Sequence, residues 1–389
     1  MALNLSKLLY RGQQPSFLTA IEPIPEAESA LKEAKETIRS HLQKAIPAWL
    51  TETLGEKPTH APRFRTQGSW AYRTCNKPCQ IPPQEMDWDL GIYLPVSLWD
   101  DNDVSPKQAA KTFYSMVKEV MAPLAKEQGW TLTEKPTCIR VILNQGTQAH
   151  VDLPLYAAPD KDFPNIKEVV AKSIFAREAF AYDQANQPLQ WDSLTRISLA
   201  CQDGTWNDSD PGLVVKWFKS KQERHGEQLR RICRYLKAWR DHVWKSGGPS
   251  SIVLMVCAAQ TLDRAAEDFE GRDDLALCHV LNALPGQLLN PVTEPMINPA
   301  EDLNRLSEED QKTAAQLADD FRRAMNQALL SGINEKIQAV LMLQEHLGQR
   351  LPANYDVISV DTTADIRTIP PVPGPRTLIP ATKAGDSEH

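Results

Sequence analysis

MDWDLGIYLP, residues 86–95, alternates between apolar and acidic side chains in its first half and is rich in strand-forming residues throughout. A period of two is typical of a β-strand, in which residues i and i+2 point to the same face. Asp87 and Asp89 are therefore expected on one face, with the apolar residues around them on the other. Two carboxylates on one face repel each other unless a cation lies between them, so the pattern predicts a metal site.

A third carboxylate comes from a second expected strand, residues 148–156 (QAHVDLPLY), in which apolar neighbours flank Asp152. Three oxygen ligands suit Mg²⁺, which completes its shell with water and phosphate oxygens. Two such ions, with Mn²⁺ as a substitute, can activate an attacking hydroxyl and neutralise a leaving pyrophosphate. The ordinary alternative is that the aspartates only solvate a turn or a strand end, but their apolar, strand-like surroundings favour the metal site.

Gly68-Ser69 stands ahead of the acidic strand and just before an expected helix. Glycine lets the backbone approach a phosphate, the helix N-terminus offers free N–H groups, and the serine hydroxyl adds a donor. Alone, the dipeptide is also compatible with an ordinary N-cap turn. Its position ahead of Asp-x-Asp favours phosphate binding.

The remaining periodicity gives a mixed first half, a helical second half and a loose end. Residues 73–85 hold three prolines and are expected to form a loop. A further strand is expected over residues 137–143. Helices are expected over residues 26–50, 106–128, 166–180, 210–245, 250–267, 274–284 and 306–349.

Composition excludes several classes of protein. The 389 residues carry a formal net charge of −7, which argues against a protein that coats long DNA or RNA. Seven scattered cysteines do not predict a disulfide framework and fit a reducing cytoplasm. No apolar run approaches the roughly 20 residues of a membrane span, the first residues do not read as a secretory signal, and no P-loop motif is present.

The helix expected over residues 210–245 carries several cations in an otherwise acidic chain. Arg231, Arg234 and Lys237 are spaced three residues apart and can share one face. Such a cluster could bind phosphate, and a solvated helix face explains it equally well.

Several segments together resemble the bacterial cyclic-oligonucleotide synthases, the CD-NTases of anti-phage CBASS systems, which are relatives of animal cyclic GMP-AMP synthase. The DncV type is the most similar, over about residues 60–310. The segments are QGSWAYRT (67–74), DWD (87–89), GIYLP (91–95), HVDLPLY (150–156), DSDP (208–211), YLKAWR (235–240) and GGPSS (247–251).

The resemblance implies an α+β fold: a nucleotidyltransferase core of the polymerase-β type, with a twisted mixed sheet and helices, plus a helical C-terminal domain. The core with its N-terminal helix is expected over residues 1–165. The helical domain, which completes the nucleotide cleft, is expected over residues 166–361, and a flexible proline-rich tail over residues 362–389.

The same resemblance assigns roles to individual positions. Asp87, Asp89 and Asp152 match the catalytic, metal-binding carboxylates. The positions that match nucleotide contacts are Gln67, Gly68, Ser69, Tyr72, Arg140, Ser209, Asp210, Lys237 and Ser251. Among them, Lys237 and Ser251 match triphosphate contacts and Arg140 a contact to a base. Ser209-Asp210-Pro211 reads equally well as a helix N-cap with proline in the first turn.

The implied function is a cytoplasmic synthase that makes a cyclic di- or oligonucleotide second messenger, 3′3′-cyclic GMP-AMP, from ATP and GTP. The product would act on a separate effector in anti-phage defence. A transferase that adds nucleotides to RNA or protein is one alternative, although the net charge does not suggest a track for long nucleic acid. A non-catalytic nucleotide sensor is the other, and the complete aspartate set argues against it. Ubiquitin-like machinery that conjugates the C-terminus is a further implied partner.

Overall fold

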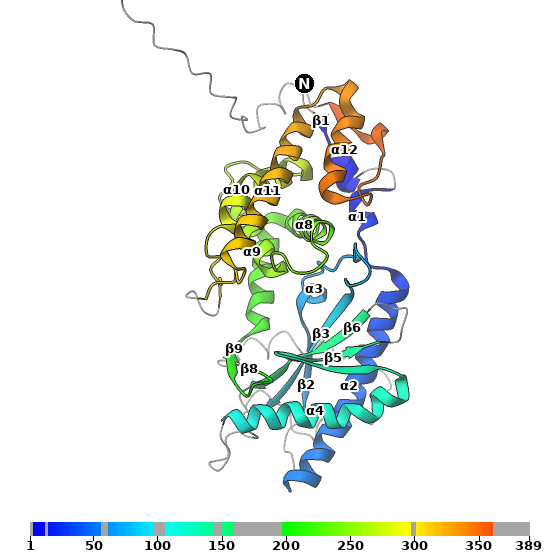
Figure 1. Ribbon diagram of the computed structural model, residues 1–389, viewed down its shortest axis with the longest axis vertical. Helices are drawn as coiled ribbons and strands as arrows, with labels where there is room; N and C mark the ends of the chain where they lie inside the picture. The colour runs from blue at the N-terminus through cyan, green and yellow to red at the C-terminus, as the bar shows by residue number, and fades with distance from the viewer. Residues whose placement is uncertain are drawn as a thin grey trace, which may run out of the picture.

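The computed structural model describes residues 3–11, 15–55, 61–95, 98, 106–143, 149–158, 197–296 and 301–360. Two packed units lie one above the other along the long axis of the molecule, a sheet unit and a helical unit (Figure 1). Each has its own large cluster of buried apolar side chains.

β3 (Met86–Pro95) is the centre of the sheet, as the alternation of its residues predicts. β6 (Ala149–Leu153) and β7 (Leu155–Ala158) both run parallel to it and keep the same register, since Met86 pairs with Ala149 and Pro95 with Ala158. They form one line along β3 with a break at Pro154, where the single strand 148–156 was expected. The strands that pair antiparallel around this centre are β2 (Arg63–Thr66), β4 (Thr131–Lys135), β5 (Cys138–Ile142), β8 (Ser198–Ala200) and β9 (Trp206–Asp208).

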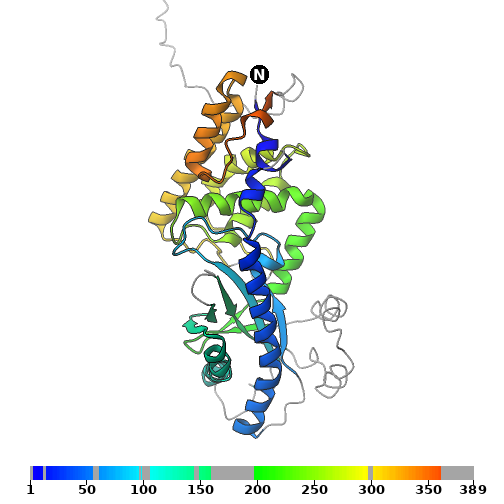
Figure 2. The ribbon, with the colours of Figure 1, turned by 90° about the vertical axis from the view of Figure 1, so that its right-hand side faces the viewer.

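Two long helices cover the apolar face of this sheet. α2 (Pro25–Leu54) and α4 (Pro106–Gln128) confirm the helices expected over 26–50 and 106–128. Both contribute to the cluster that buries Met86, Trp88 and Leu90, and α2 runs the length of the sheet unit in Figure 2. The opposite face of β3, which carries the aspartates, is therefore left for the site.

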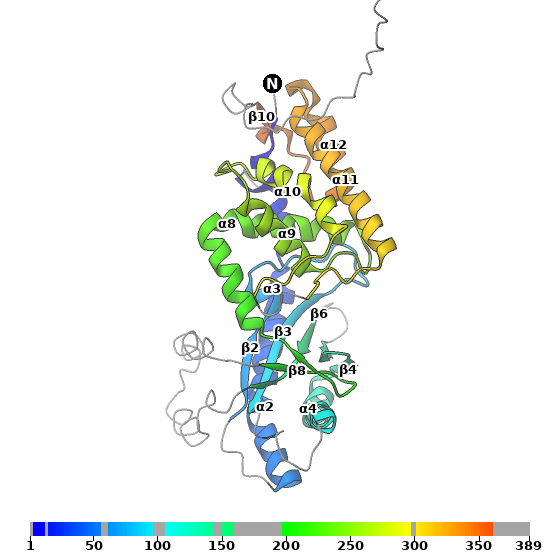
Figure 3. The same ribbon diagram turned by 90° about the vertical axis from the view of Figure 1, so that its left-hand side faces the viewer.

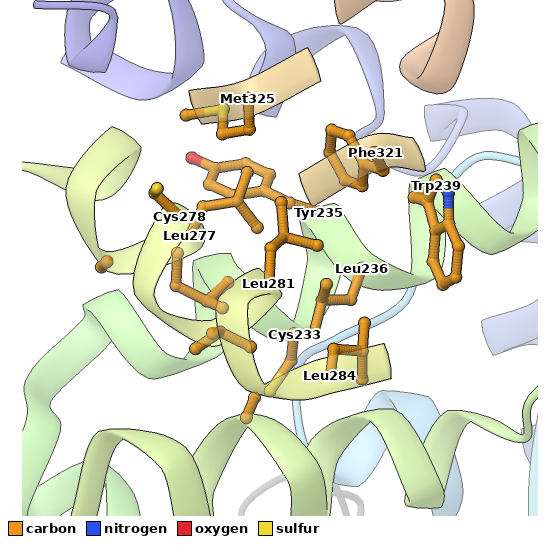
Figure 4. Packing of buried hydrophobic residues seen from close by; sticks show 14 of the residues in the cluster. Cys233, Tyr235, Leu236, Trp239, Leu277, Cys278, Leu281, Leu284, Phe321 and Met325 are labelled. Atoms are coloured by element: carbon orange, nitrogen blue, oxygen red, sulfur yellow. The ribbon is translucent and has the colours of Figure 1, made fainter. Parts of the chain in front are cut away.

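The helical unit is built around the second half of α8. Its elements are α8 (Pro211–Val243), α9 (Ser251–Asp263), α10 (Asp273–Leu288), α11 (Glu308–Leu330), η4 (Ile333–Glu335), α12 (Lys336–Leu347) and η5 (Tyr355–Val357). Tyr235 and Trp239 of α8 are fully buried and face Leu281 of α10 and Phe321 of α11 in Figure 4. The helix expected over 306–349 is divided, because α11 ends at Leu330 and a 3-10 turn precedes α12.

Two segments lie across the domain boundary expected between residues 165 and 166. β1 (Leu3–Asn4), the π-helix η1 (Lys7–Arg11) and α1 (Phe17–Ala20) pack into the core of the helical unit, and β1 pairs with β10 (Ser359–Val360). In the other direction, β8 and β9 extend the sheet. Short apolar segments without periodicity are placed by tertiary packing, which a sequence pattern does not show. The expected helix 166–180 and tail 362–389 lie outside the described residues.

The two units are joined by the proline-rich loop 73–85, which hydrogen-bonds to the end of α8. Gln80 donates to the carbonyl oxygens of Asp241 and His242 at 3.1 and 2.8 Å. Gln84 donates to those of Asp241 and Trp244 at 2.8 Å each. Figure 3 shows that the first half of α8 lies against the sheet unit. The helix bends at Gly226, where its second half begins.

All seven cysteines are free, which confirms that the chain has no disulfide framework. Among the described helices, none has the length and apolar character of a membrane span.

Candidate active site

A cavity of about 630 Å³ lies where the aspartate-bearing face of the sheet meets the helical unit. It gathers side chains from α3 (Gly68–Ala71), from the loop 73–85, from β3, β5 and β6, and from α8 and α9. The residues expected at nucleotides or metal that line it are Gln67, Gly68, Ser69, Tyr72, Asp87, Asp89, Arg140, Ser209, Asp210, Lys237 and Ser251. Of the expected set, Asp152 alone does not line the cavity.

The carboxylates lie on adjacent strands in register. Asp89 is the β-pairing partner of Asp152, and Asp87 is that of His150. Burial and the neighbouring charges of Asp87 and Asp152 raise the pKa of Asp89 to about 8. The surroundings of Asp89 therefore oppose its negative charge, and the described side chains do not compensate this effect in full.

Asp152 is held by an ion pair with Arg140 of β5. The guanidinium donates from Nε to Oδ1 and from Nη2 to Oδ2, both at 2.8 Å. This bidentate contact raises the pKa of Arg140. The role of Arg140 as a base contact stays a prediction, because in this structure both of these donors point to Asp152.

Asp87 and Asp89 fit a divalent cation by the chemistry of their oxygen donors and by the repulsion that raises the pKa of Asp89. Across the described ranges, no three or more His, Cys, Asp or Glu side chains are already grouped as metal ligands. Both oxygens of Asp152 accept hydrogen bonds from Arg140 in this structure.

The charge at Asp89 should make the metal-free protein less stable at alkaline pH. The folded-state pKa of about 8 lies above the ordinary value of 3.8, so the contribution of Asp89 to stability is present at low pH and is lost as pH rises through about 8. Asp89→Asn should therefore unfold about 1–3 °C above the wild type at pH 9, which corresponds to about 1–2 kcal/mol for a chain of this length. At pH 4 the two unfolding temperatures should differ little. Thermal unfolding in EDTA measures this gap. Mg²⁺ should reduce this difference in unfolding temperature. A difference that is the same at pH 4 and pH 9 would contradict the raised pKa of Asp89.

Gly68 and Ser69 are packed against the acidic strand. Gly68 has a positive φ of 58°, and a Cβ atom there would lie 1.9 Å from Oδ2 of Asp89, so a larger residue does not fit. The Oγ atom of Ser69 is buried beside the Cys75 thiol, whose pKa it acts to lower, and it has no oxygen or nitrogen partner among the described residues. An unpartnered hydroxyl that faces a cavity is suited to donate to a ligand oxygen.

Gln67 and Tyr72 contribute mainly through packing in this structure. The Gln67 amide donates to the hydroxyl of Tyr93 at 2.7 Å and accepts from that of Tyr156 at 3.1 Å, beneath the stacked rings of the two tyrosines. Tyr72 lies edge-on to Phe218 of α8, and burial raises its pKa. Gln67 ties the start of α3 to its surroundings, and Tyr72 does so at the end.

Lys237 is the member of the expected cation cluster that reaches the cavity. It is buried, its pKa is lowered by burial, and its Nζ donates to the carbonyl oxygen of Thr74 at 2.8 Å. Arg231 instead pairs with buried Asp273, and Arg234 donates to Asn76 at 2.9 Å. A shared phosphate-binding face of these three residues is therefore wrong.

Asp210 caps α8, as its position before Pro211 predicts. Its Oδ1 accepts from the backbone N–H groups of Gly212 and Leu213 at 2.8 and 3.3 Å. Ser251 accepts from Nη1 of Arg240 at 3.0 Å at the start of α9. Both residues also line the cavity. Their contact with a nucleotide stays a prediction.

Several cavity residues were not predicted from the sequence, chiefly Gln84, Glu85, His150 and Asp241. The signal for His150 was present, because it stands two residues before Asp152 on the same strand and therefore on the same face. The other three depend on how the loop 73–85 meets α8, which no local pattern reports.

Comparison with known proteins gives two family matches. Residues 62–156 match the family described as cyclic GMP-AMP synthase DncV-like, nucleotidyltransferase domain, and residues 226–360 match cyclic GMP-AMP synthase, C-terminal domain. Proteins named cyclic GMP-AMP synthase from Escherichia coli and Vibrio cholerae are each 37% identical, over 54% and 53% of this chain. The chain spans about half the length of these curated relatives, 49% of each.

Solved structures give the same fold. The crystal structure of Vibrio cholerae DncV cyclic AMP-GMP synthase aligns with a TM-score of 0.72 at 23% identity, over 92% of this chain and 100% of that one. The form in complex with the linear intermediate 5′-pppA(3′,5′)pG aligns with a TM-score of 0.73, also at 23% identity, over 93% and 100%. This likeness establishes the polymerase-β-type α+β fold with a helical C-terminal region.

Proposed function

Since this chain belongs to the DncV-like nucleotidyltransferase family, we propose that it joins ATP and GTP into a cyclic dinucleotide, 3′3′-cyclic GMP-AMP, and releases pyrophosphate. The relatives at 37% identity carry the name cyclic GMP-AMP synthase. The observation that carries the proposal is the cavity in which Asp87 and Asp89 of β3 converge with Ser69 of α3 and Lys237 of α8, three separate segments.

Asp87 and Asp89 would hold divalent cations, two Mg²⁺ or in their place Mn²⁺, and Asp152 would join them when one of its oxygens is released by Arg140. Such ions supply charge neutralisation for phosphate oxygens and lower the pKa of an attacking hydroxyl. Bound cations would reduce the repulsion between Asp89 and the neighbouring carboxylates, and would stabilise the site in this way.

The chain's own groups would bind and orient the nucleotides. Ser69 donates its free hydroxyl to a phosphate oxygen of the donor nucleotide, and the ammonium group of Lys237 offsets the charge of the triphosphate. The ribose hydroxyl oxygen of the acceptor bonds to the α-phosphorus and passes its proton to a neighbouring carboxylate or water. The bond between the α-phosphorus and the bridging oxygen breaks, and pyrophosphate leaves with the electron pair. A second transfer of the same kind closes the ring.

Incubation of the protein with labelled ATP and GTP, without RNA or protein acceptor, tests the proposal. A phosphatase-resistant product with the mass of cyclic GMP-AMP, together with two pyrophosphates per product, is expected. Label that enters only added RNA or protein would instead support the transferase, and nucleotide binding without pyrophosphate release would support the sensor.

Ser69→Ala should lower kcat/KM for pyrophosphate release by about 10- to 100-fold, because a hydrogen bond to a charged group contributes about 1.5–3 kcal/mol. The unfolding temperature should change little, since the Oγ of Ser69 has no oxygen or nitrogen partner among the described residues. Ser331→Ala is the matched control, because its buried hydroxyl donates to the carbonyl oxygen of Gln327 far from the cavity. Equal kcat/KM for wild type and Ser69→Ala would remove Ser69 from the phosphate site.

The proposal extends to the surroundings of the enzyme in the cell. The cyclic product would act on a separate effector in anti-phage defence, and ubiquitin-like machinery would conjugate the C-terminus. Residues 361–389 lie outside the described residues, so mass spectrometry of the protein from its native host is the test of the conjugate.

A further inference from the structure

We propose that Trp70 is a positioning residue that fixes Ser69 of α3 relative to Asp87 and Asp89 of β3. The inference deepens the proposed function and rests on it for the identity of the ligand, a nucleoside triphosphate. Trp70 follows Ser69 directly in the chain, but it does not line the cavity. Its effect on a nucleotide is therefore expected to be indirect, through the placement of Ser69.

The start of α3 takes the place of a strand at the edge of β3 beside the aspartates. β2 ends at Thr66, and the chain then turns into α3. The backbone N–H of Gln67 still donates to the carbonyl oxygen of Asp89 at 2.9 Å, which continues the antiparallel ladder by one bond. The carbonyl oxygen of Asp87, two residues earlier, accepts from the indole Nε1 of Trp70 at 2.6 Å. The side chain of Trp70 therefore supplies the donor that a longer β2 would supply.

Trp70 also packs against the apolar cluster of the sheet unit. Its ring stacks on that of Trp88, with the ring centroids 4.5 Å apart and the planes at 19°. Trp88 is 6% exposed, and its Nε1 donates to the hydroxyl of Thr66 at 3.2 Å. Nζ of Lys35 on α2 lies 5.0 Å from the centroid of the Trp88 ring. Trp70 thus combines a directional hydrogen bond with a broad aromatic contact to a buried side chain.

The two anchors of α3 lie on either side of Gly68 and Ser69. Gln67 binds the main chain of Asp89 just before them, and Trp70 binds that of Asp87 just after them. α3 is only four residues long, and a helix of one turn is not stable by itself, so these contacts set its orientation. A misplacement of about 1 Å in a positioned group can lower a rate by about 10²-fold.

Replacement of the indole by a smaller ring separates the hydrogen bond from the stacking. Trp70→Phe keeps an aromatic ring beside Trp88 and removes the N–H donor. Its kcat/KM for pyrophosphate release, and its affinity for a non-hydrolysable ATP analogue with Mg²⁺, should each fall by about 3- to 10-fold, the range of one hydrogen bond. Trp70→Leu removes both contacts and should lower both quantities further.

Trp49→Phe is the matched control. Nε1 of Trp49 likewise donates a hydrogen bond, to Oε2 of Glu119 at 2.9 Å, and its ring packs against the same apolar cluster outside the cavity. This variant should keep the kcat/KM and the affinity of the wild type. Neither phenylalanine variant should unfold more than about 3 °C below the wild type, so a difference in stability would not explain a difference in activity.

A double-mutant cycle with Ser69→Ala shows whether Trp70 acts through Ser69. Once the hydroxyl is absent, Trp70 has little left to position. Trp70→Phe should therefore lower kcat/KM and affinity by less than about 2-fold in the Ser69→Ala background. A residue that only stabilises the fold would cost the same factor in both backgrounds. Pyrophosphate release gives the cycle for kcat/KM, and calorimetry with the ATP analogue gives it for affinity.

Two results would overturn the positioning role. One is wild-type kcat/KM and affinity in Trp70→Phe, and the other is an equal cost of Trp70→Phe with and without the Ser69 hydroxyl. Coupling of the two residues in affinity, in a protein that releases no pyrophosphate, would support the positioning role and reject the proposed synthase. A wild type that neither binds the analogue nor releases pyrophosphate would overturn both.

Discussion

Replacement of both Asp87 and Asp89 by asparagine is expected to lower the rate of cyclic product formation by about 10³-fold or more. A single preorganised electrostatic group contributes about 10²–10³ in rate, and here two are removed from alternate positions on one strand. Asparagine keeps the shape of the side chain but does not carry the charge that holds a divalent cation. The loss should appear in pyrophosphate release and in product alike.

This double variant should keep its fold, so misfolding would not explain its loss of activity. The repulsion that raises the pKa of Asp89 disappears in the variant, so its unfolding temperature in EDTA should equal or exceed that of the wild type. A matched double variant on the surface, Asp319→Asn with Asp320→Asn, should keep full activity, because both carboxylates pair with partly exposed arginines on α11 and neither lines the cavity. Full activity of Asp87→Asn with Asp89→Asn would refute the site.

Asp273→Leu should destabilise the helical unit by about 3–5 kcal/mol, because it leaves the partly buried Arg231 without its counter-charge. Asp273 is fully buried and accepts hydrogen bonds from Nε and Nη2 of Arg231 at 2.6 and 2.7 Å, and from Tyr235 at 3.0 Å. Arg231 also stacks on Tyr10, with its Cζ 3.8 Å from the ring centroid. The N-terminal segment should therefore loosen together with the helices.

Chemical denaturation, monitored by hydrogen exchange of amides in the helical unit, measures this loss of stability. The paired variant Asp273→Leu with Arg231→Met should recover most of the lost stability, since a buried ion pair can be replaced by apolar side chains at little cost. Asp320→Ala, which breaks an exposed pair with Arg323, should change stability by less than about 0.5 kcal/mol. An equal effect of Asp273→Leu and Asp320→Ala would contradict the structural role given to Asp273.

The acidic strand was predictable because its period-two pattern is strong and local. Met86 and Leu90 are buried against α2 and α4, and the aspartates between them face the cavity, as alternation requires. The glycine at position 68 was also predictable, because close approach of the backbone to another group demands the smallest residue. The structure shows that this group is Asp89.

The cation cluster shows why the rest was not predictable. Spacing along a helix places Arg231, Arg234 and Lys237 on one face but does not report what that face meets. Their partners are Asp273, Asn76 and Thr74, which come from 42, 158 and 163 residues away in the chain. The roles of the three cations are therefore set by tertiary packing, and only Lys237 remains for a ligand.

The glutamines that fasten the loop 73–85 to α8 bind main-chain oxygens and no side chain of that helix. Side chains at the end of α8 can therefore change in evolution without loss of these hydrogen bonds, provided that Gln80 and Gln84 are retained. A chimaera that takes its sheet half from this protein and its helical half from a diverged relative should preserve the alignment of the two halves.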